Sequence, residues 1–184
     1  SPESQFMVLR NLKPCTVFEV TVCRTPIRIS TCEFEYDLIR IEKTDNPLGE
    51  LRVMSYDLEC LGKDGKFPDP EEDPIITIGA DVWGAGMKSQ VAFCLHSTEG
   101  YKSFNNEHDM LKAFCNYVKA VDPDCIAGHN SNRFDNVYFE KRCKVLGVRF
   151  RWSRLRRGKT RVRHTKIVTN QRGTIEQFIL ECPG

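Results

Sequence analysis

Hydrophobic residues change their periodicity in a fixed order along residues 51–146, and this order most constrains the fold of the chain. Three strand-like segments joined by a loop and a short turn come first, as in an antiparallel meander. A helical spacing of apolar residues, a short buried strand and a second helical spacing follow. The sequence therefore predicts an α/β domain in which a mixed β-sheet carries helices on its faces. The expected elements are strands at 51–61, 74–83 and 90–95, a helix at 105–122, a strand at 124–128 and a helix at 133–146.

The first strand of this unit, "LRVMSYDLECL", runs from an apolar start into two acids. Side chains alternate faces along a strand, so the face that holds Asp57 and Glu59 also holds Leu51, Val53 and Ser55. Like charges at neighbouring positions on one face repel each other. Such a pair persists when it is well solvated, shares a proton or holds a metal ion. The other acid-x-acid pairs of the chain are interpreted as solvated, since none continues the face of a buried strand.

A third acid, Asp135, lies in the first turn of the second predicted helix, just after the strand at 124–128. Ligands gather at the carboxyl ends of strands in open α/β sheets. If this strand and the strand at 51–61 are parallel neighbours, their ends open into one cleft with Asp57 and Glu59. Asp135 also has an explanation that needs no ligand, because the positive end of a helix dipole favours an acid there.

Charge is divided unevenly along the chain. Residues 141–184 carry 13 Lys and Arg against two acids, whereas the remaining residues carry 14 basic and 23 acidic side chains. This basic tail favours a polyanionic partner, although a solvated basic loop explains the same run of charge. We expect a hairpin that turns at 170–173 and DNA contacts from Arg156, Arg157 and Arg161.

Composition is that of an ordinary globular protein, with 40% hydrophobic and 28% charged residues. Residues 1–50 are interpreted as strands, loops and a linker, ahead of one domain at 51–184. No window approaches the roughly 18 apolar residues of a membrane span, so no membrane partner is expected.

The nine cysteines form no C-x-x-C motif and are expected to be reduced thiols of an intracellular protein. The chain has no signal-peptide layout and no initiating Met, so we expect a piece of a longer protein.

Two stretches resemble the exonuclease motifs of family B DNA polymerases. "SYDLEC" at 55–60 is similar to the first motif, and "GHNSNRFD" at 128–135 is similar to the second. "FPDPEEDPIITI" and "VDPDCIAGHN" are similar to the delta-like branch, and stretches within 6–39 resemble the end of its amino-terminal domain. The resemblance implies a ribonuclease-H-like exonuclease fold. It also implies a 3′→5′ proofreading exonuclease within a replicative DNA-directed DNA polymerase.

This resemblance assigns roles residue by residue. Asp57, Glu59 and Asp135 are implied to bind two Mg²⁺ or Mn²⁺ ions, which serve hydrolysis of the 3′-terminal phosphodiester of mispaired DNA. Asp57 would bridge both ions. Glu59 would hold the ion of the attacking water and contact the terminal sugar hydroxyl, and Asp135 would support the second ion. Asn130 and Phe134 would shape the channel for the frayed single strand.

The sequence departs from the family pattern at three places. His129 stands where the family commonly has Tyr, and Arg133 stands where it often has a small polar residue. The third motif, Tyr-x-x-x-Asp, is missing, since no Asp follows Asp135. We therefore expect this chain by itself to bind metal weakly and to have negligible nuclease activity.

The implied partners are a DNA primer–template, a single-stranded 3′ end and accessory replication subunits, in the nucleus or at a viral replication site. Two other functions stay open at this point. One is a ribonuclease-H-like nuclease outside the polymerases, and the other is a catalytically inactive module that binds nucleic acid. Retention of Asp57, Glu59 and Asp135 together argues against the inactive module, because relaxed sites lose acids that no longer hold metal.

Overall fold

The computed structural model divides the chain into two compact units, residues 1–50 and 51–184. Within the ranges that it describes, no helix is long and apolar enough to cross a membrane. Those ranges are 2–10, 12–13, 16–25, 34–47, 49–63, 65–96, 99–155, 159–169 and 173–182.

The first unit combines a short helix, α1 (Pro2–Leu9), with an antiparallel strand pair, β1 (Phe18–Arg24) and β2 (Tyr36–Lys43). The helix corrects the interpretation of residues 1–50 as strands and loops. Proline is suited to the first position of a helix, where its missing N–H would have no intrahelical partner. No other Pro or Gly interrupts the segment, so the local sequence is compatible with a helix.

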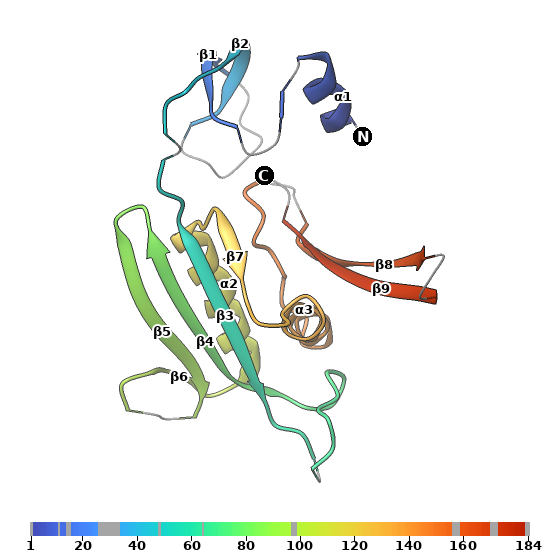
Figure 1. Cartoon of the computed structure of the whole chain (residues 1–184). Helices are drawn as coiled ribbons and strands as arrows, with labels where there is room; N and C mark the ends of the chain where they lie inside the picture. Colours follow the sequence, from blue (N-terminus) through green and yellow to red (C-terminus); the bar gives the residue numbers. More distant parts are fainter. Residues whose placement is uncertain are drawn as a thin grey trace. The chain divides into compact units, whose positions relative to one another are not determined.

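The second unit is built on a five-stranded sheet with the order β6-β5-β4-β3-β7 (Figure 1). The pairs β3–β4 and β4–β5 are antiparallel, whereas β5–β6 and β3–β7 are parallel. The predicted mixed sheet is therefore confirmed, and the short strand β6 is an addition that the sequence did not suggest. The strands are β3 (Val53–Cys60), β4 (Ile75–Gly84), β5 (Met87–Leu95), β6 (Lys102–Phe104) and β7 (Cys125–Ala127).

Helix α2 (Glu107–Val121) covers one face of this sheet and lies behind it in Figure 1. Asn106 caps the helix, since its side-chain oxygen accepts the backbone N–H of Asp109 at 2.8 Å. Buried side chains of α2 pack against the residues of β3 that face it, so the core lies on the face of β3 that has no acids. This core includes Met54, Tyr56 and Leu58 of β3 and Met110, Leu111, Phe114 and Val118 of α2.

The opposite face of the sheet carries the two acids of β3, and both Asp57 and Glu59 are exposed there. Asp57 pairs with Gly79 on β4, which in turn pairs with Ala92 on β5. A Cβ atom on Gly79 would meet no heavy atom within 4 Å. The row beside Asp57 therefore has little side-chain bulk, and the sheet surface is flat at this level.

Helix α3 (Asp135–Val145) is fixed to the sheet by a buried ion pair. The Arg142 guanidinium donates to the Glu107 carboxylate from Nε at 2.9 Å and also from Nη2. Its Nη1 group donates to the Pro70 carbonyl at 3.1 Å. Glu107 in turn accepts the backbone N–H of Ile75 at 2.9 Å. This one charged pair joins α3, the start of α2 and the start of β4.

Strands β8 (Arg161–Thr169) and β9 (Gly173–Glu181) form an antiparallel hairpin, which confirms the hairpin predicted at the end of the chain. The turn at 170–172 lies outside the described residues, as do Arg156 and Arg157. The predicted DNA contacts of those two arginines therefore stay predictions.

Several cations of the basic tail bind acids of the same chain. These ion pairs neutralise part of the positive charge of residues 141–184. Less positive charge is therefore available to an outside partner than the sequence suggests. The predicted DNA contact of Arg161 stays a prediction, and it competes with an internal ion pair. The pairs are Arg161 and Arg163 with Glu181, Lys166 with Glu176, Lys144 with Glu140, and Arg154 with Asp122 and Asp124.

Arg142→Ala should lower the free energy of unfolding by about 3–5 kcal/mol, because it leaves the Glu107 carboxylate buried and unpaired. Lys144→Ala is the matched control on the same helix. Its 3.2 Å pair with Glu140 has an exposed lysine, so that effect should stay within about 1 kcal/mol. Urea unfolding at neutral pH measures both values. Equal decreases in the two variants would show that the buried pair does not hold α3 in place.

Candidate active site

The edge of β3 changes partner halfway along the strand. β7 pairs with β3 only opposite Val53, Met54 and Ser55. Farther along the same edge, the backbone N–H of Leu58 donates to the Asp135 carboxylate at 3.2 Å. A buried amide needs a partner, and here a side chain replaces the missing strand. The condition set out from the sequence, that these two strands are parallel neighbours, is thus met, and Asp135 lies at the level of the two acids of β3.

Two positions in the turn between β7 and α3 restrict the type of residue that can occupy them. A Cβ atom on Gly128 would come within 2.8 Å of the Ser131 Cβ and 3.1 Å of the Tyr56 carbonyl oxygen. Asn130 has a φ of 57°, in the left-handed region that Asn tolerates better than most residues. Its carbonyl accepts the N–H of Arg133 at 2.9 Å and begins the turn that leads into α3. Asn130 therefore shapes this turn.

Asn136 fastens the start of α3 to the sheet, and sequence reasoning missed it. The Tyr56 hydroxyl donates to Asn136 Oδ1 at 2.5 Å, and Asn136 Nδ2 donates to Asn132 Oδ1 at 3.0 Å. The backbone N–H of Asn136 donates to the Ser131 carbonyl at 2.8 Å. The sequence offered only a weak signal, an amide side chain directly after the acid at a helix start.

The electrostatics of the site centre on Asp135, which is only 2% exposed. Burial raises the pKa of Asp135, and the negative charge of Asp57 raises it further, while the Leu58 N–H acts in the opposite direction. The Asp57 and Asp135 carboxylates are therefore close enough to repel each other. Glu59 is exposed on the same strand face as Asp57. In the described part of the chain, no three His, Cys, Asp or Glu side chains are grouped closely enough to hold a metal ion.

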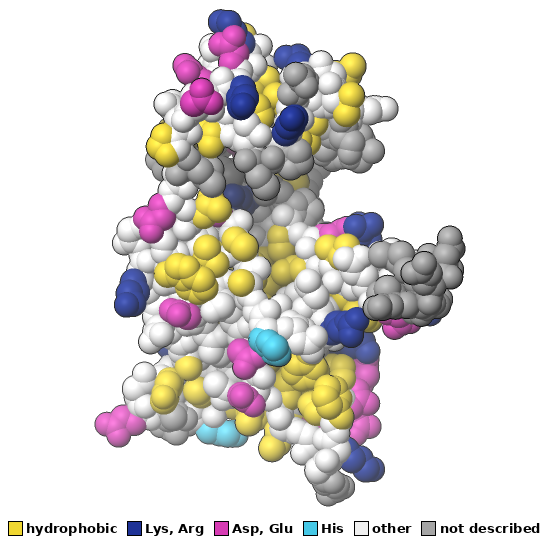
Figure 2. Space-filling model, in the orientation of Figure 1, with side chains coloured by type: hydrophobic (Ala, Val, Ile, Leu, Met, Phe, Trp, Pro, Cys, Tyr) yellow, Lys and Arg dark blue, Asp and Glu magenta, His cyan; other side chains and the backbone are white. Residues whose placement is uncertain are grey.

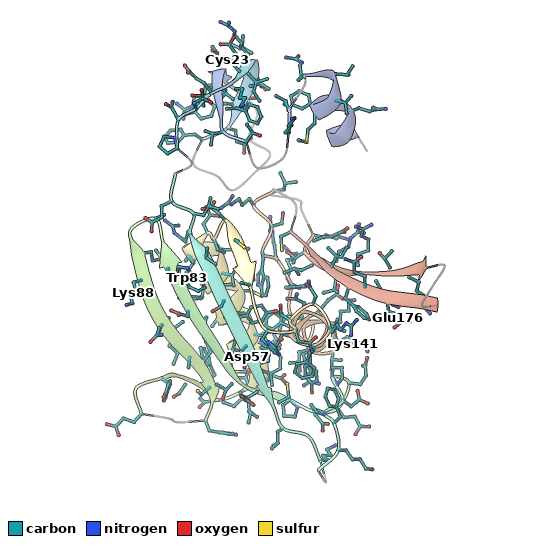
Figure 3. All side chains as sticks on the ribbon, viewed as in Figure 1. Cys23, Asp57, Trp83, Lys88, Lys141 and Glu176 are labelled. Carbon is teal, nitrogen blue, oxygen red and sulfur yellow. The ribbon has the colours of Figure 1, made fainter. Side chains whose placement is uncertain are left out.

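A cavity of about 840 Å³ opens beside Asp57 on the uncovered face of the sheet. Its floor includes Gly79 and Ala92, and its walls include His129 and Lys102. Figure 2 shows acidic and histidine side chains together near the middle of this face, next to a hydrophobic patch. Figure 3 labels Asp57 on β3. His129, which departs from the family pattern, thus lies at the cavity rather than away from it.

An aromatic pair borders the acids. Phe134 packs edge-to-face on Phe67, with ring centroids 5.4 Å apart, and also lies 5.3 Å from the Tyr138 ring. Phe67 is 80% exposed, which is unusual for so large an apolar side chain. Sequence reasoning missed Phe67, although its place in the loop directly after the acidic strand was a signal. The pair offers an apolar surface next to Asp135.

A family profile described as "DNA polymerase family B, exonuclease domain" matches residues 1–184. This chain belongs to that family. Among curated relatives, the DNA polymerase delta catalytic subunit of Mesocricetus auratus is 33% identical to this chain. The match covers 79% of this chain and 15% of that relative's length. The DNA polymerase delta catalytic subunit of Dictyostelium discoideum is 29% identical over 98% of this chain and 18% of its own length. The chain thus spans less than a fifth of the length of these relatives.

A solved structure agrees with the fold. The family B DNA polymerase from the hyperthermophilic archaeon Pyrobaculum calidifontis matches 82% of this chain and 18% of its own, with a TM-score of 0.64 and 26% sequence identity. This confirms the predicted α/β exonuclease fold and the resemblance on which it was based. The structure brings Asp57, Asp135 and Phe134 to one region, with Asn130 in the adjoining turn. Their roles toward metal and DNA stay predictions.

Asp135→Asn should raise the melting temperature at about pH 8 in metal-free buffer. The pKa of Asp135 is raised in the folded chain, so its stabilising contribution is present below the unfolded pKa and is lost as the pH rises through the folded pKa. The amide keeps an oxygen for the Leu58 N–H and removes the charge. At acid pH the two proteins should melt alike.

Asp124→Asn is a control that should change the melting temperature in the opposite direction. The backbone N–H of Arg52 and the Arg154 side chain lower the pKa of Asp124, so its contribution is present at pH 8 and is lost as the pH falls. This variant should melt lower than the parent at about pH 8. Thermal scans followed by circular dichroism measure both. A lower melting temperature for Asp135→Asn at that pH would contradict the electrostatic description of the site.

Proposed function

We propose that this chain is the 3′→5′ proofreading exonuclease region of a replicative DNA-directed DNA polymerase. One observation carries the proposal. The Asp135 carboxylate is held by the Leu58 N–H at the end of the strand that bears Asp57 and Glu59. Membership of the family B exonuclease-domain family and similarity to delta catalytic subunits support the same function. A nuclease outside the polymerases has no such support.

Asp57, Glu59 and Asp135 would hold two Mg²⁺ or Mn²⁺ ions, and their side chains would have to draw together to do so, since no three such side chains of the described residues are grouped as a metal site. The donor set fits such ions, because both prefer hard carboxylate oxygens and keep several waters. The burial of Asp135 beside another acid, which raises its pKa, is a second reason, since a cation would relieve the repulsion. When bound, the ions would lower the pKa of the attacking water and stabilise the leaving 3′ oxygen.

The chain's own residues would position the strand to be cut. The flat floor at Gly79 and Ala92 leaves room for a nucleotide beside Asp57. Phe67 and Phe134 would stack on the unpaired base, since aromatic rings accept any base by its π-face. The bond between Tyr56 and Asn136 would keep α3, and with it Asp135, in one position during turnover.

The proposed substrate is a primer–template whose mispaired 3′ end has frayed into a single strand. Accessory replication subunits are the proposed protein partners, by similarity to proteins that are named as catalytic subunits. The nucleus or a viral replication site is the proposed place of action. Removal of the two acids of β3 distinguishes an active nuclease from an inactive nucleic-acid-binding module.

In the full-length polymerase, Asp57→Ala combined with Glu59→Ala should abolish 3′→5′ excision and leave DNA synthesis largely intact, because synthesis would use a separate site. Removal of a mispaired primer terminus in Mg²⁺, followed on a gel, measures excision. Asp69→Ala with Glu71→Ala is the matched control, since this acid-x-acid pair lies in the loop after β3. Excision at the parental rate by the first variant would mean that the module is inactive or that the site lies elsewhere.

Phe67→Ala should weaken binding of a single-stranded 3′ end by about 1–3 kcal/mol, the range found for base–aromatic stacking. The side chain is exposed, so unfolding by urea should change little. Leu61→Ala is the control, because Leu61 is another exposed apolar residue near the end of β3. Fluorescence anisotropy with a labelled oligonucleotide measures binding. If the two variants bind equally, the aromatic pair is not part of the substrate path.

A further inference from the structure

A hollow of about 340 Å³ lies in the helix layer, between α2 and the segment that follows α3. Because α2 packs on the core face of the sheet, this hollow is on the other side of the sheet from Asp57. We call it the basic hollow, and no carboxylate is among its described lining residues. Its charged and polar lining residues are His108, Lys112, Asn116 and Lys119 of α2 and Arg149 and Arg151 of the following segment.

The cations of the basic hollow are close together. Lys112 and Lys119 are separated by two turns of α2, which places them about 10.5 Å apart along the helix axis. Arg149 and Arg151 face them from the second segment. Partial loss of solvent around its ammonium group lowers the pKa of Lys119, and the positive charges of Arg151 and Arg149 lower it further. The two segments therefore bring like charges together across the hollow.

The basic hollow differs from the basic tail in its countercharge. In the tail, Arg161 and Arg163 share the Glu181 carboxylate. Within the part of the chain that the structure describes, no salt bridge involves Lys112, Lys119 or Arg149. Asp109, an acid of the first turn of α2, accepts a hydrogen bond from the Asn106 side chain at 2.9 Å, and its charge also interacts with that of Lys112 without forming a salt bridge. The hollow is thus a place where an external anion would meet several cations that have no salt-bridge partner in the described part of the chain.

We propose that the basic hollow binds phosphate groups of single-stranded DNA, as a contact separate from the acidic site. Guanidinium and ammonium groups together supply the charge-assisted hydrogen bonds that phosphate oxygens accept. The lysine row of about 10.5 Å is long enough to contact more than one phosphate of a strand. The choice of DNA over an acidic polypeptide rests on the proposed function of the chain.

The test is the salt dependence of binding in the Lys112→Ala/Lys119→Ala variant. Both lysines are exposed, so the fold should persist, and urea unfolding checks this. A labelled oligonucleotide of about 12 nucleotides, within the site size of one binding groove, is titrated in EDTA at several salt concentrations. The log–log slope should shrink by about 1.4, or about 0.7 for each phosphate that the variant no longer neutralises. Lys43→Ala/Lys88→Ala is the control with the same change of charge, and its slope should match the parent.

Two outcomes overturn the proposal. One is a slope and affinity in the Lys112→Ala/Lys119→Ala variant that equal those of the control. The other is unchanged DNA binding together with abolished binding of an oligo-glutamate peptide, which would make the hollow a site for an acidic polypeptide. Failure of the proposed function is recognised separately, because Asp57→Ala/Glu59→Ala removes carboxylates on the other face of the sheet and is scored by excision rather than by this slope.

Discussion

The hydrogen bond between the Leu58 amide and the Asp135 carboxylate is the contact on which the proposed site depends. It exists because β7 ends after pairing with Ser55, so the next amides of β3 on that edge have no partner among the described strands. A buried amide needs an acceptor. Asp135 supplies it, and a carboxylate of a helix thereby reaches the strand that carries Asp57. The pKa of Asp135 rises as a consequence of its burial there. A buried acid whose pKa is raised beside a second acid is typical of a functional site, and that second acid, Asp57, lines the cavity on this face of the sheet.

The rest of the unit holds this contact in place from two sides. Tyr56 reaches from the core face of β3 to Asn136, at the start of α3. The buried pair of Arg142 and Glu107 fixes the same helix near its other end. One face of the sheet therefore supplies packing and the other presents acids. The basic hollow belongs to the packed side, so the sheet separates a negative region from a positive one, and a DNA strand would meet them at different points.

Local signals in the sequence predicted much of this arrangement. Alternation placed Asp57 and Glu59 on one strand face, and helical spacing placed Asp135 in the first turn of α3, as the structure shows. The partners of Arg142 and Asn136 are 35 and 80 residues away, and periodicity carries no information about them. Helix α1 was missed because its apolar residues show no clear pattern. Counting charges overstated the free charge of the tail, because ion pairs form only in the fold.

A titration of the isotope-labelled chain with Mn²⁺, followed by amide NMR, tests the central claim most directly. Paramagnetic broadening reports which amides lie closest to the bound ion, whatever the affinity. The account predicts that the amides of Asp57, Leu58 and Asp135 broaden first, and that Asp135→Asn delays this broadening to higher Mn²⁺ concentrations. Broadening that begins instead in the acidic loop at 69–73, with the Leu58 amide unaffected, would contradict it.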